Sequence, residues 1–102
     1  MKKVINGKMY NTDTAKNLGE WWNGVPRNDF NCCEETLYRK KTGEFFLYGE
    51  GGANTKYSKS AGQNSRSGGS EIIPLTESEA KKWVEDRLDA DAYISIWGEP
   101  EE

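Results

Sequence analysis

Few residues of this 102-residue chain could do chemistry, because it contains no histidine and only two cysteines. Histidine is the commonest general base and metal ligand, so catalysis would need Cys, Ser or Lys activated by a carboxylate or a tyrosine. Cys32 and Cys33 precede Glu34 and Glu35, and nearby negative charge raises a thiol pKa and weakens the nucleophile. Adjacent cysteines rarely form a disulfide, and further zinc ligands are missing. We therefore predict a non-enzymatic protein with no catalytic residue, metal or cofactor, whose cysteines pack as small hydrophobic side chains.

A glycine-rich segment from Gly49 to Gly52 follows a predicted strand and could offer successive backbone amides to an anion. It lacks the Gly-Lys-Ser/Thr ending of a phosphate-binding loop, and the same glycines would permit a turn and close packing. The anion interpretation predicts a binder of a nucleotide signal. Its ligand-binding residues would be Gly51, Gly52, Lys56, Tyr57 and Arg66.

Aromatic side chains are the other candidates for recognition, since Trp is favoured in interface hot spots. Of the four tryptophans, we predict that Trp22 is left exposed, because it stands in a polar, turn-rich stretch. Tyr38, Phe46 and Tyr48 fall on one face of a predicted hairpin, where they could stack single-stranded nucleic acid or be covered by the C-terminal helix. The predicted partner-binding residues are Trp22, Tyr38, Arg39, Phe46, Tyr48, Glu99 and Glu101.

A central β-hairpin must position these side chains. Its strands are Thr36 to Lys40 and Glu44 to Tyr48, both rich in β-branched and aromatic residues, and Gly43 gives the turn a residue that accepts positive φ. A lone hairpin is marginal in water, so the rest of the chain must cover at least one face. The turn predicts a register in which Arg39 faces Phe45, Tyr38 faces Phe46, and Leu37 faces Leu47.

The segments around this hairpin predict further short elements. Val4 to Tyr10 reads as a hairpin that turns at Asn-Gly, and Thr12 to Leu18 reads as a brief helix that Gly19 ends. Residues 49–70 are rich in Gly, Ser, Asn and Lys, which predicts a flexible loop with a short helix near residues 53–60. Glu71 to Leu75 predicts a strand that its proline confines to a sheet edge or to a strand end.

The C-terminal third predicts one bent helix or two consecutive helices. Thr76 to Glu79 is a capping box, and an apolar stripe with helical period follows it. Asp89 can cap a second helical pattern, which Gly98 ends, and residues 98–102 form an acidic tail. We therefore predict a single α+β domain over residues 1–102. A small antiparallel sheet of two hairpins plus an edge strand carries the C-terminal helix, bent or split.

The overall composition argues against some classes of function, among them membrane proteins and general nucleic-acid binders. The net charge of −3 argues against broad nucleic-acid affinity, which normally shows as a basic face. The hydrophobic fraction of 34% indicates a small core, to which a partner or self-association would add burial. No apolar run is long enough for a signal peptide or a membrane span, and unpaired thiols suit a reducing compartment. We predict a cytoplasmic protein of a bacterial host that does not bind membranes.

Four segments together resemble a group of small proteins from gut Firmicutes and their phages and mobile elements, mostly without assigned function. They are KVINGKMYNTDTAK, ETLYRKKTGEFFLYGEGG, SEIIPLTESEAKKW and LDADAY, which span the chain from end to end. Small acidic proteins that are carried by phages and mobile elements are often inhibitors of bacterial defence, including anti-CRISPR proteins. The resemblance implies a binding protein that occupies a surface of a host defence protein, with a CRISPR effector nuclease as the expected partner. The nucleotide-signal binder and the single-strand nucleic-acid module stay as alternatives.

Overall fold

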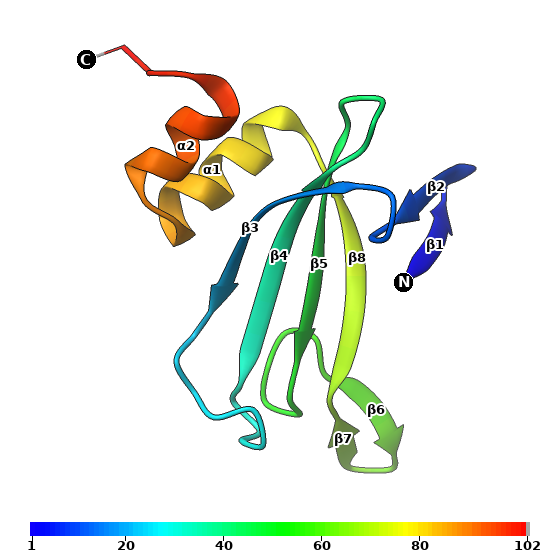
Figure 1. Ribbon diagram of the computed structural model, residues 1–102. Coiled ribbons are helices and arrows are strands. Elements are labelled where there is room, and N and C mark those ends of the chain that lie inside the picture. The colour runs from blue at the N-terminus through cyan, green and yellow to red at the C-terminus, as the bar shows by residue number, and fades with distance from the viewer. Residues whose placement is uncertain (102) are drawn as a thin grey trace.

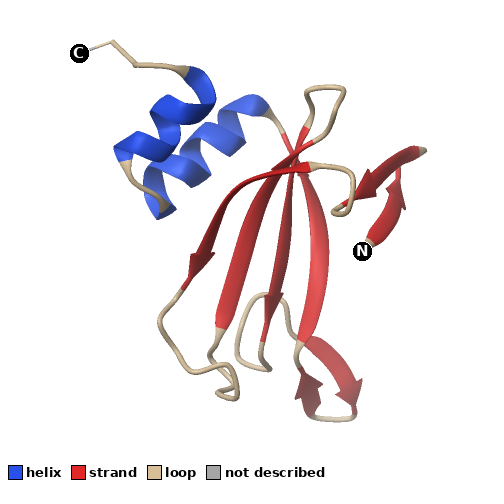
Figure 2. Cartoon of the chain, viewed as in Figure 1, coloured by secondary structure: helices blue, strands red, loops and turns tan. Residues whose placement is uncertain are grey.

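The computed structural model describes residues 1–101 and shows an α+β fold, with the strands preceding the helices (Figures 1 and 2). Strands β3, β4, β5 and β8 form an antiparallel sheet in that order, and the β1–β2 and β6–β7 hairpins form separate two-stranded ribbons. The predicted α+β class is confirmed. The elements are β1 (Lys2–Ile5), β2 (Lys8–Asn11), β3 (Lys16–Trp22), β4 (Cys33–Arg39), β5 (Phe45–Gly51), β6 (Lys59–Gly62), β7 (Ser65–Ser67), β8 (Gly69–Leu75), α1 (Glu77–Arg87) and α2 (Ala90–Trp97).

The central hairpin of β4 and β5 has the predicted register, with Leu37 opposite Leu47 and Tyr38 opposite Phe46. Gly43 adopts a φ of +93°, which lets the three-residue turn close without strain. Because side chains alternate across a strand, the two leucines lie on one face of the sheet and the two aromatic rings on the other. Strand β8 pairs with β5 and is the last strand of the sheet, so the predicted edge position is confirmed.

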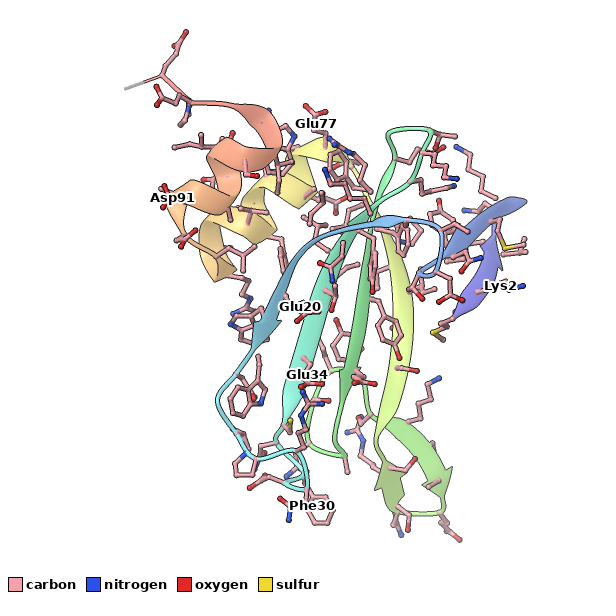
Figure 3. All side chains as sticks on the ribbon, in the orientation of Figure 1. Lys2, Glu20, Phe30, Glu34, Glu77 and Asp91 are labelled. Carbon is pink, nitrogen blue, oxygen red and sulfur yellow. The ribbon has the colours of Figure 1, made fainter. Side chains whose placement is uncertain are left out.

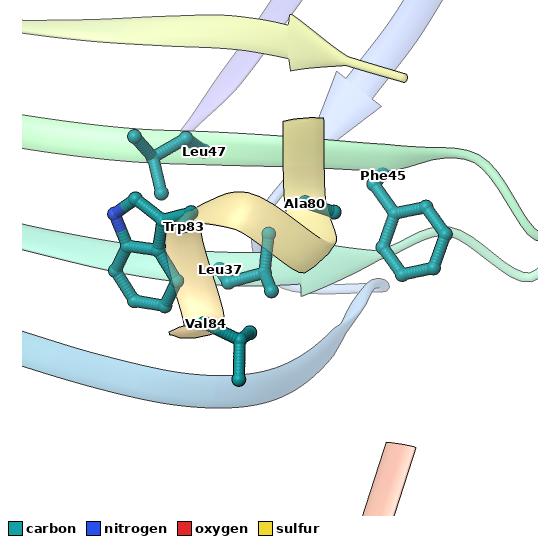
Figure 4. Close-up of a cluster of buried hydrophobic side chains, with 6 residues drawn as sticks. All are labelled: Leu37, Phe45, Leu47, Ala80, Trp83 and Val84. Carbon is teal, nitrogen blue, oxygen red and sulfur yellow. The ribbon is translucent and has the colours of Figure 1, made fainter. Parts of the chain in front are cut away.

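Helices α1 and α2 cover the face that carries the leucines. Figure 4 shows the resulting core, in which side chains from β4 and β5 meet side chains from α1. The capping box at Thr76 and the cap at Asp89 start the two helices as predicted, and Gly98 ends the second. Neither helix of residues 1–101 is long and apolar enough to cross a membrane. The buried cluster comprises Leu37, Phe45, Leu47, Ala80, Trp83 and Val84.

The opposite face of the sheet is covered at one end, by the N-terminal β1–β2 hairpin. Tyr10 meets Phe46 edge-on with ring centroids 5.4 Å apart, and Tyr38 stacks on Phe46 at 5.2 Å. Phe46 is completely buried as a result. The alternative in which the C-terminal helix covers Tyr38 and Phe46 was wrong, because that helix packs on the leucine face.

Two predictions of local structure were also wrong. Residues 16–22 form strand β3 instead of continuing a helix, and Gly19 lies within it where a Cβ would collide with the side chain of Leu88. The predicted helix near residues 53–60 is a series of turns that leads into β6. Part of the segment expected to be a loop thus forms the β6–β7 hairpin, which extends from the end of the sheet farthest from the helices (Figure 1).

Candidate functional site

The uncovered end of the sheet carries glutamates on three neighbouring strands. Glu34 of β4 lies directly opposite Glu50 of β5, and Glu20 of β3 lies opposite Thr36 of β4. These residues alternate with core residues, so they face away from α1. Figure 3 shows Glu20 and Glu34 on adjacent strands. The residues line a cleft of about 510 Å³ and are named here the acidic face: Glu20, Trp22, Glu34, Thr36, Tyr48 and Glu50.

The carboxylates of the acidic face repel one another. Like charges directly opposite in a sheet are destabilising. Burial raises the pKa of Glu34, and a hydrogen bond with Glu50 and the charges of Glu50 and Glu20 raise it further. Arg27 partly offsets this through contacts of 2.7 and 3.2 Å with the two oxygens of Glu34. Within residues 1–101, Glu34 is the only one of these three glutamates with an ion pair, and its partner Arg27 is 79% exposed.

Exposed aromatic rings border the acidic face. Trp22 is 51% exposed, as predicted, and its indole N–H donates to the carbonyl of Val25 at 2.7 Å, which holds the ring in place. Phe30, in the connection between β3 and β4, is 69% exposed but does not line the cleft. Tyr48 lies within the face, and its hydroxyl lies 3.4 Å from a carboxylate oxygen of Glu50. The face therefore combines two carboxylates without an ion pair in the described part of the chain, those of Glu20 and Glu50, with the rings of Trp22 and Tyr48.

The next residue along β4, Glu35, lies on the helix side of the sheet and is 1% exposed. Its carboxylate accepts hydrogen bonds from the Tyr57 hydroxyl and from the Trp83 indole N–H at 3.0 Å, and it pairs with the Lys56 ammonium at 2.7 Å. Burial raises the pKa of Glu35, but the hydrogen bonds from Lys56, Tyr57 and Trp83 outweigh it, so the net pKa is lowered. This network fastens the turn after β5 and helix α1 to the sheet.

The residues predicted to bind an anion are engaged in other contacts. Lys56 and Tyr57 both bond to Glu35, and Tyr57 is almost fully buried. Arg66 lies on β7 and is exposed in the β6–β7 hairpin. The charged residues of the predicted ligand site are therefore not gathered around one open pocket.

The glycines of that predicted site serve close packing. A Cβ on Gly51 would overlap with the Thr55 side chain, and one on Gly52 would overlap with the backbone of Phe30. The amide of Gly52 already donates to the carbonyl of Cys32 at 3.0 Å. This geometry gives no support to the predicted anion site.

Both cysteines are buried and free of disulfides, consistent with a packing role. Burial and the charge of Glu35 raise the pKa of the Cys33 thiol. Among residues 1–101, no group of three or more Cys, Asp or Glu side chains is placed to hold a metal ion.

The predicted partner-binding residues are spread over the molecule. Arg39 lies on the helix side, with its guanidinium 5.9 Å from the centre of the Phe45 ring, and Phe46 is covered by the N-terminal hairpin. Glu99 and Glu101 are exposed beyond the end of α2. Two of the predicted residues, Trp22 and Tyr48, do belong to the acidic face.

Sequence reasoning did not select Glu20, Glu34 and Glu50. The signal for two of them was present, because extending the predicted hairpin register by three residues places Glu34 opposite Glu50. Glu20 could not be found in this way, since β3 was predicted as a helix and a turn.

The chain matches no protein-family model, no curated protein and no solved structure. The resemblance to phage and mobile-element proteins therefore stays a prediction. Arguments about function have to start from the geometry of the acidic face.

Proposed function

We propose that this is a non-enzymatic binding protein that docks its acidic face on a basic surface of another protein. The observation that carries the proposal is the direct opposition of Glu34 and Glu50 on the uncovered end of the sheet. Like charges in this position cost stability, and sequences tend to accept such local conflicts at functional sites. A partner that supplies cations removes the conflict on binding.

The chemistry of the face favours arginine or lysine side chains from the partner. Arg27 already places a guanidinium on Glu34 in a two-pronged contact, which is the geometry that a partner arginine would use. Carboxylates on three strands can accept more than one such cation. Tyr48 offers a ring for cation–π contact, and the exposed ring of Trp22 offers an apolar anchor.

The proposed partner is a bacterial defence effector, and a CRISPR effector nuclease in particular. Such nucleases hold nucleic acid in a positively charged channel, and carboxylates spaced along a sheet can occupy a surface built for phosphates. The resemblance to proteins of phages and mobile elements supports this choice of partner. Charge complementarity of this kind also speeds the encounter of the two proteins.

Capture experiments with three forms of the protein test the proposal. The wild type is compared with a face variant, Glu20→Gln/Glu50→Gln, and with a tail variant, Glu99→Gln/Glu101→Gln, which changes the net charge by the same amount. Each form is immobilised and exposed to a lysate of a bacterium that carries a CRISPR system, and bound proteins are quantified by mass spectrometry. Purified RNA-guided nuclease is then assayed for DNA cleavage in the presence of each form.

We expect a nuclease subunit to be enriched by the wild type and the tail variant, and to be lost with the face variant. Cleavage should be inhibited in the same order. Enrichment that depends on the tail and not on the face would move the site to the C-terminus and contradict the proposal. Equal recovery by all three forms, or cleavage unaffected by the wild type, would also contradict it.

A further inference from the structure

Positive charge is concentrated in two short segments of this acidic chain. Residues 1–16 and 39–44 together contain seven Lys or Arg and two Asp or Glu, a net side-chain charge of +5. The rest of the chain contains seven basic and fifteen acidic residues, a net charge of −8. The net charge of −3 therefore hides a strong separation of charge.

The fold brings the two basic segments together. Lys8 of β2 contacts Glu44 of the β4–β5 turn at 3.3 Å, and the Lys40 ammonium lies 4.3 Å from the centre of the Tyr10 ring. The two hairpins thus form one surface, named here the basic pole, and Figure 3 shows Lys2 far across the molecule from Asp91. The basic pole comprises Lys2, Lys3, Lys8, Lys40 and Lys41.

Most of the charge on the basic pole is not neutralised. Within residues 1–101, Lys2, Lys3 and Lys41 are exposed and form no ion pair. Lys8 and Lys40 share the single carboxylate of Glu44.

The shape of the basic pole suits a nucleic-acid duplex. Strands β1 and β2 form a two-stranded ribbon beside the main sheet (Figure 1), and such a ribbon fits the major groove of DNA. Val4 and Met9 are directly opposite each other on this ribbon and are 60% and 52% exposed. Apolar side chains in this position can contact the methyl groups of thymine while lysines contact the phosphates.

The acidic remainder of the chain does not cancel this attraction. The molecule is 49 Å long, whereas screening in physiological salt confines exposed charges to a range of about 8 Å. Phosphates at the basic pole therefore interact mainly with the local lysines. We infer that the basic pole binds the phosphate backbone of duplex DNA, with the β1–β2 ribbon in the major groove. This surface is separate from the acidic face and does not depend on the function proposed for it.

Fluorescence anisotropy with a short labelled DNA duplex tests the inference over a series of KCl concentrations. The pole variant is Lys2→Gln/Lys41→Gln, which changes two exposed lysines that form no ion pair. The control is Lys59→Gln/Lys82→Gln, which removes the same charge outside the pole. Thermal melting checks that both variants are folded. A poly-glutamate peptide serves as a competing anion without the shape of a duplex.

We expect the wild type and the control to bind the duplex with an affinity that falls as salt rises. The slope of log K against log salt should be smaller by about two for the pole variant, since each phosphate contact contributes about 0.9. Absence of duplex binding by the wild type at low salt would overturn the inference. So would an equal loss in the control, or preferential binding of poly-glutamate, which would assign the pole to an acidic protein.

Discussion

Glu34 and Glu35 are neighbours in sequence but face opposite environments. Glu35 lies on the helix side, where Lys56, Tyr57 and Trp83 bond to its carboxylate and lower its pKa. Glu34 lies on the acidic face, where burial and neighbouring carboxylates raise its pKa. The more deeply buried carboxylate is thus the better stabilised of the two.

The contrast separates a carboxylate that is part of the architecture from one that is not. A buried charge persists only when it is paired and hydrogen-bonded, so the partners of Glu35 are part of the architecture. The conflict around Glu34 has no such role in the fold. Under the proposed function, a partner would supply the missing cations.

The largest effect is expected from Glu35→Ala. This change leaves the Tyr57 hydroxyl and the Trp83 indole N–H buried without an acceptor, and it frees Lys56. The free energy of unfolding should fall by about 3 kcal/mol, measured by urea denaturation. Glu34→Ala is the matched control and should cost far less, since it also removes repulsion. Equal losses for the two variants would contradict the contrast.

Gly49→Ala should be the next most severe change. A Cβ at this position would overlap with the buried ring of Tyr57 and push its hydroxyl away from Glu35. The expected loss is about 2 kcal/mol, as for other overpacked positions. A double-mutant cycle with Tyr57→Phe separates the steric effect from the hydrogen bond. The two losses should be less than additive, and strict additivity would show that Gly49 acts by another route.

Glu35→Gln should have a smaller effect that depends on pH. The lowered pKa of Glu35 means that its ionised form stabilises the fold above the pKa it has in the unfolded chain. That contribution is lost as the pH falls through the lower pKa of the folded state. The variant should be less stable than the wild type by about 1 kcal/mol at neutral pH, and the gap should close in acid. A gap that stays constant with pH would exclude a charged Glu35.

The smallest expected effect has the opposite sign. Glu50→Gln removes the carboxylate opposite Glu34, so it should raise stability at neutral pH by about 0.5 kcal/mol. Because the pKa of Glu34 is raised, its ionisation costs stability progressively as the pH rises from the ordinary glutamate pKa to the raised one, and the full cost is present above it. The gain should therefore disappear in acid, where both groups are protonated. Glu85→Gln on α1 is the control, and a similar gain there would reflect net charge alone.

Local signals in the sequence predicted the parts of the fold that depend on local structure. The turn at Gly43 fixed the register of the central hairpin, and the caps at Thr76 and Asp89 located both helices. Strand β3 was missed because Gly19 was interpreted as the end of a helix. This glycine instead makes room for the side chain of Leu88, which is distant in the sequence.

The contacts of the candidate site also divide into those that local signals predict and those made by residues distant in sequence. The opposition of Glu34 and Glu50 follows from the predicted register, whereas the bonds that hold Glu35 come from residues 21 to 48 positions later. No pattern near Glu35 indicates these partners. The exposure of Trp22 was predictable from its polar surroundings. Glu20 could be placed on the acidic face only once β3 was known to be a strand.

Titration of the glutamate carboxyl groups by carbon-detected NMR tests the central contrast most directly. The signals of Glu34 and Glu35 can be assigned by comparison with Glu34→Gln and Glu35→Gln. We predict that Glu35 titrates below the ordinary range of glutamate and that Glu34 titrates above it. The reverse order, or ordinary values for both groups, would contradict the account of a satisfied carboxylate on the helix side and an unsatisfied one on the acidic face.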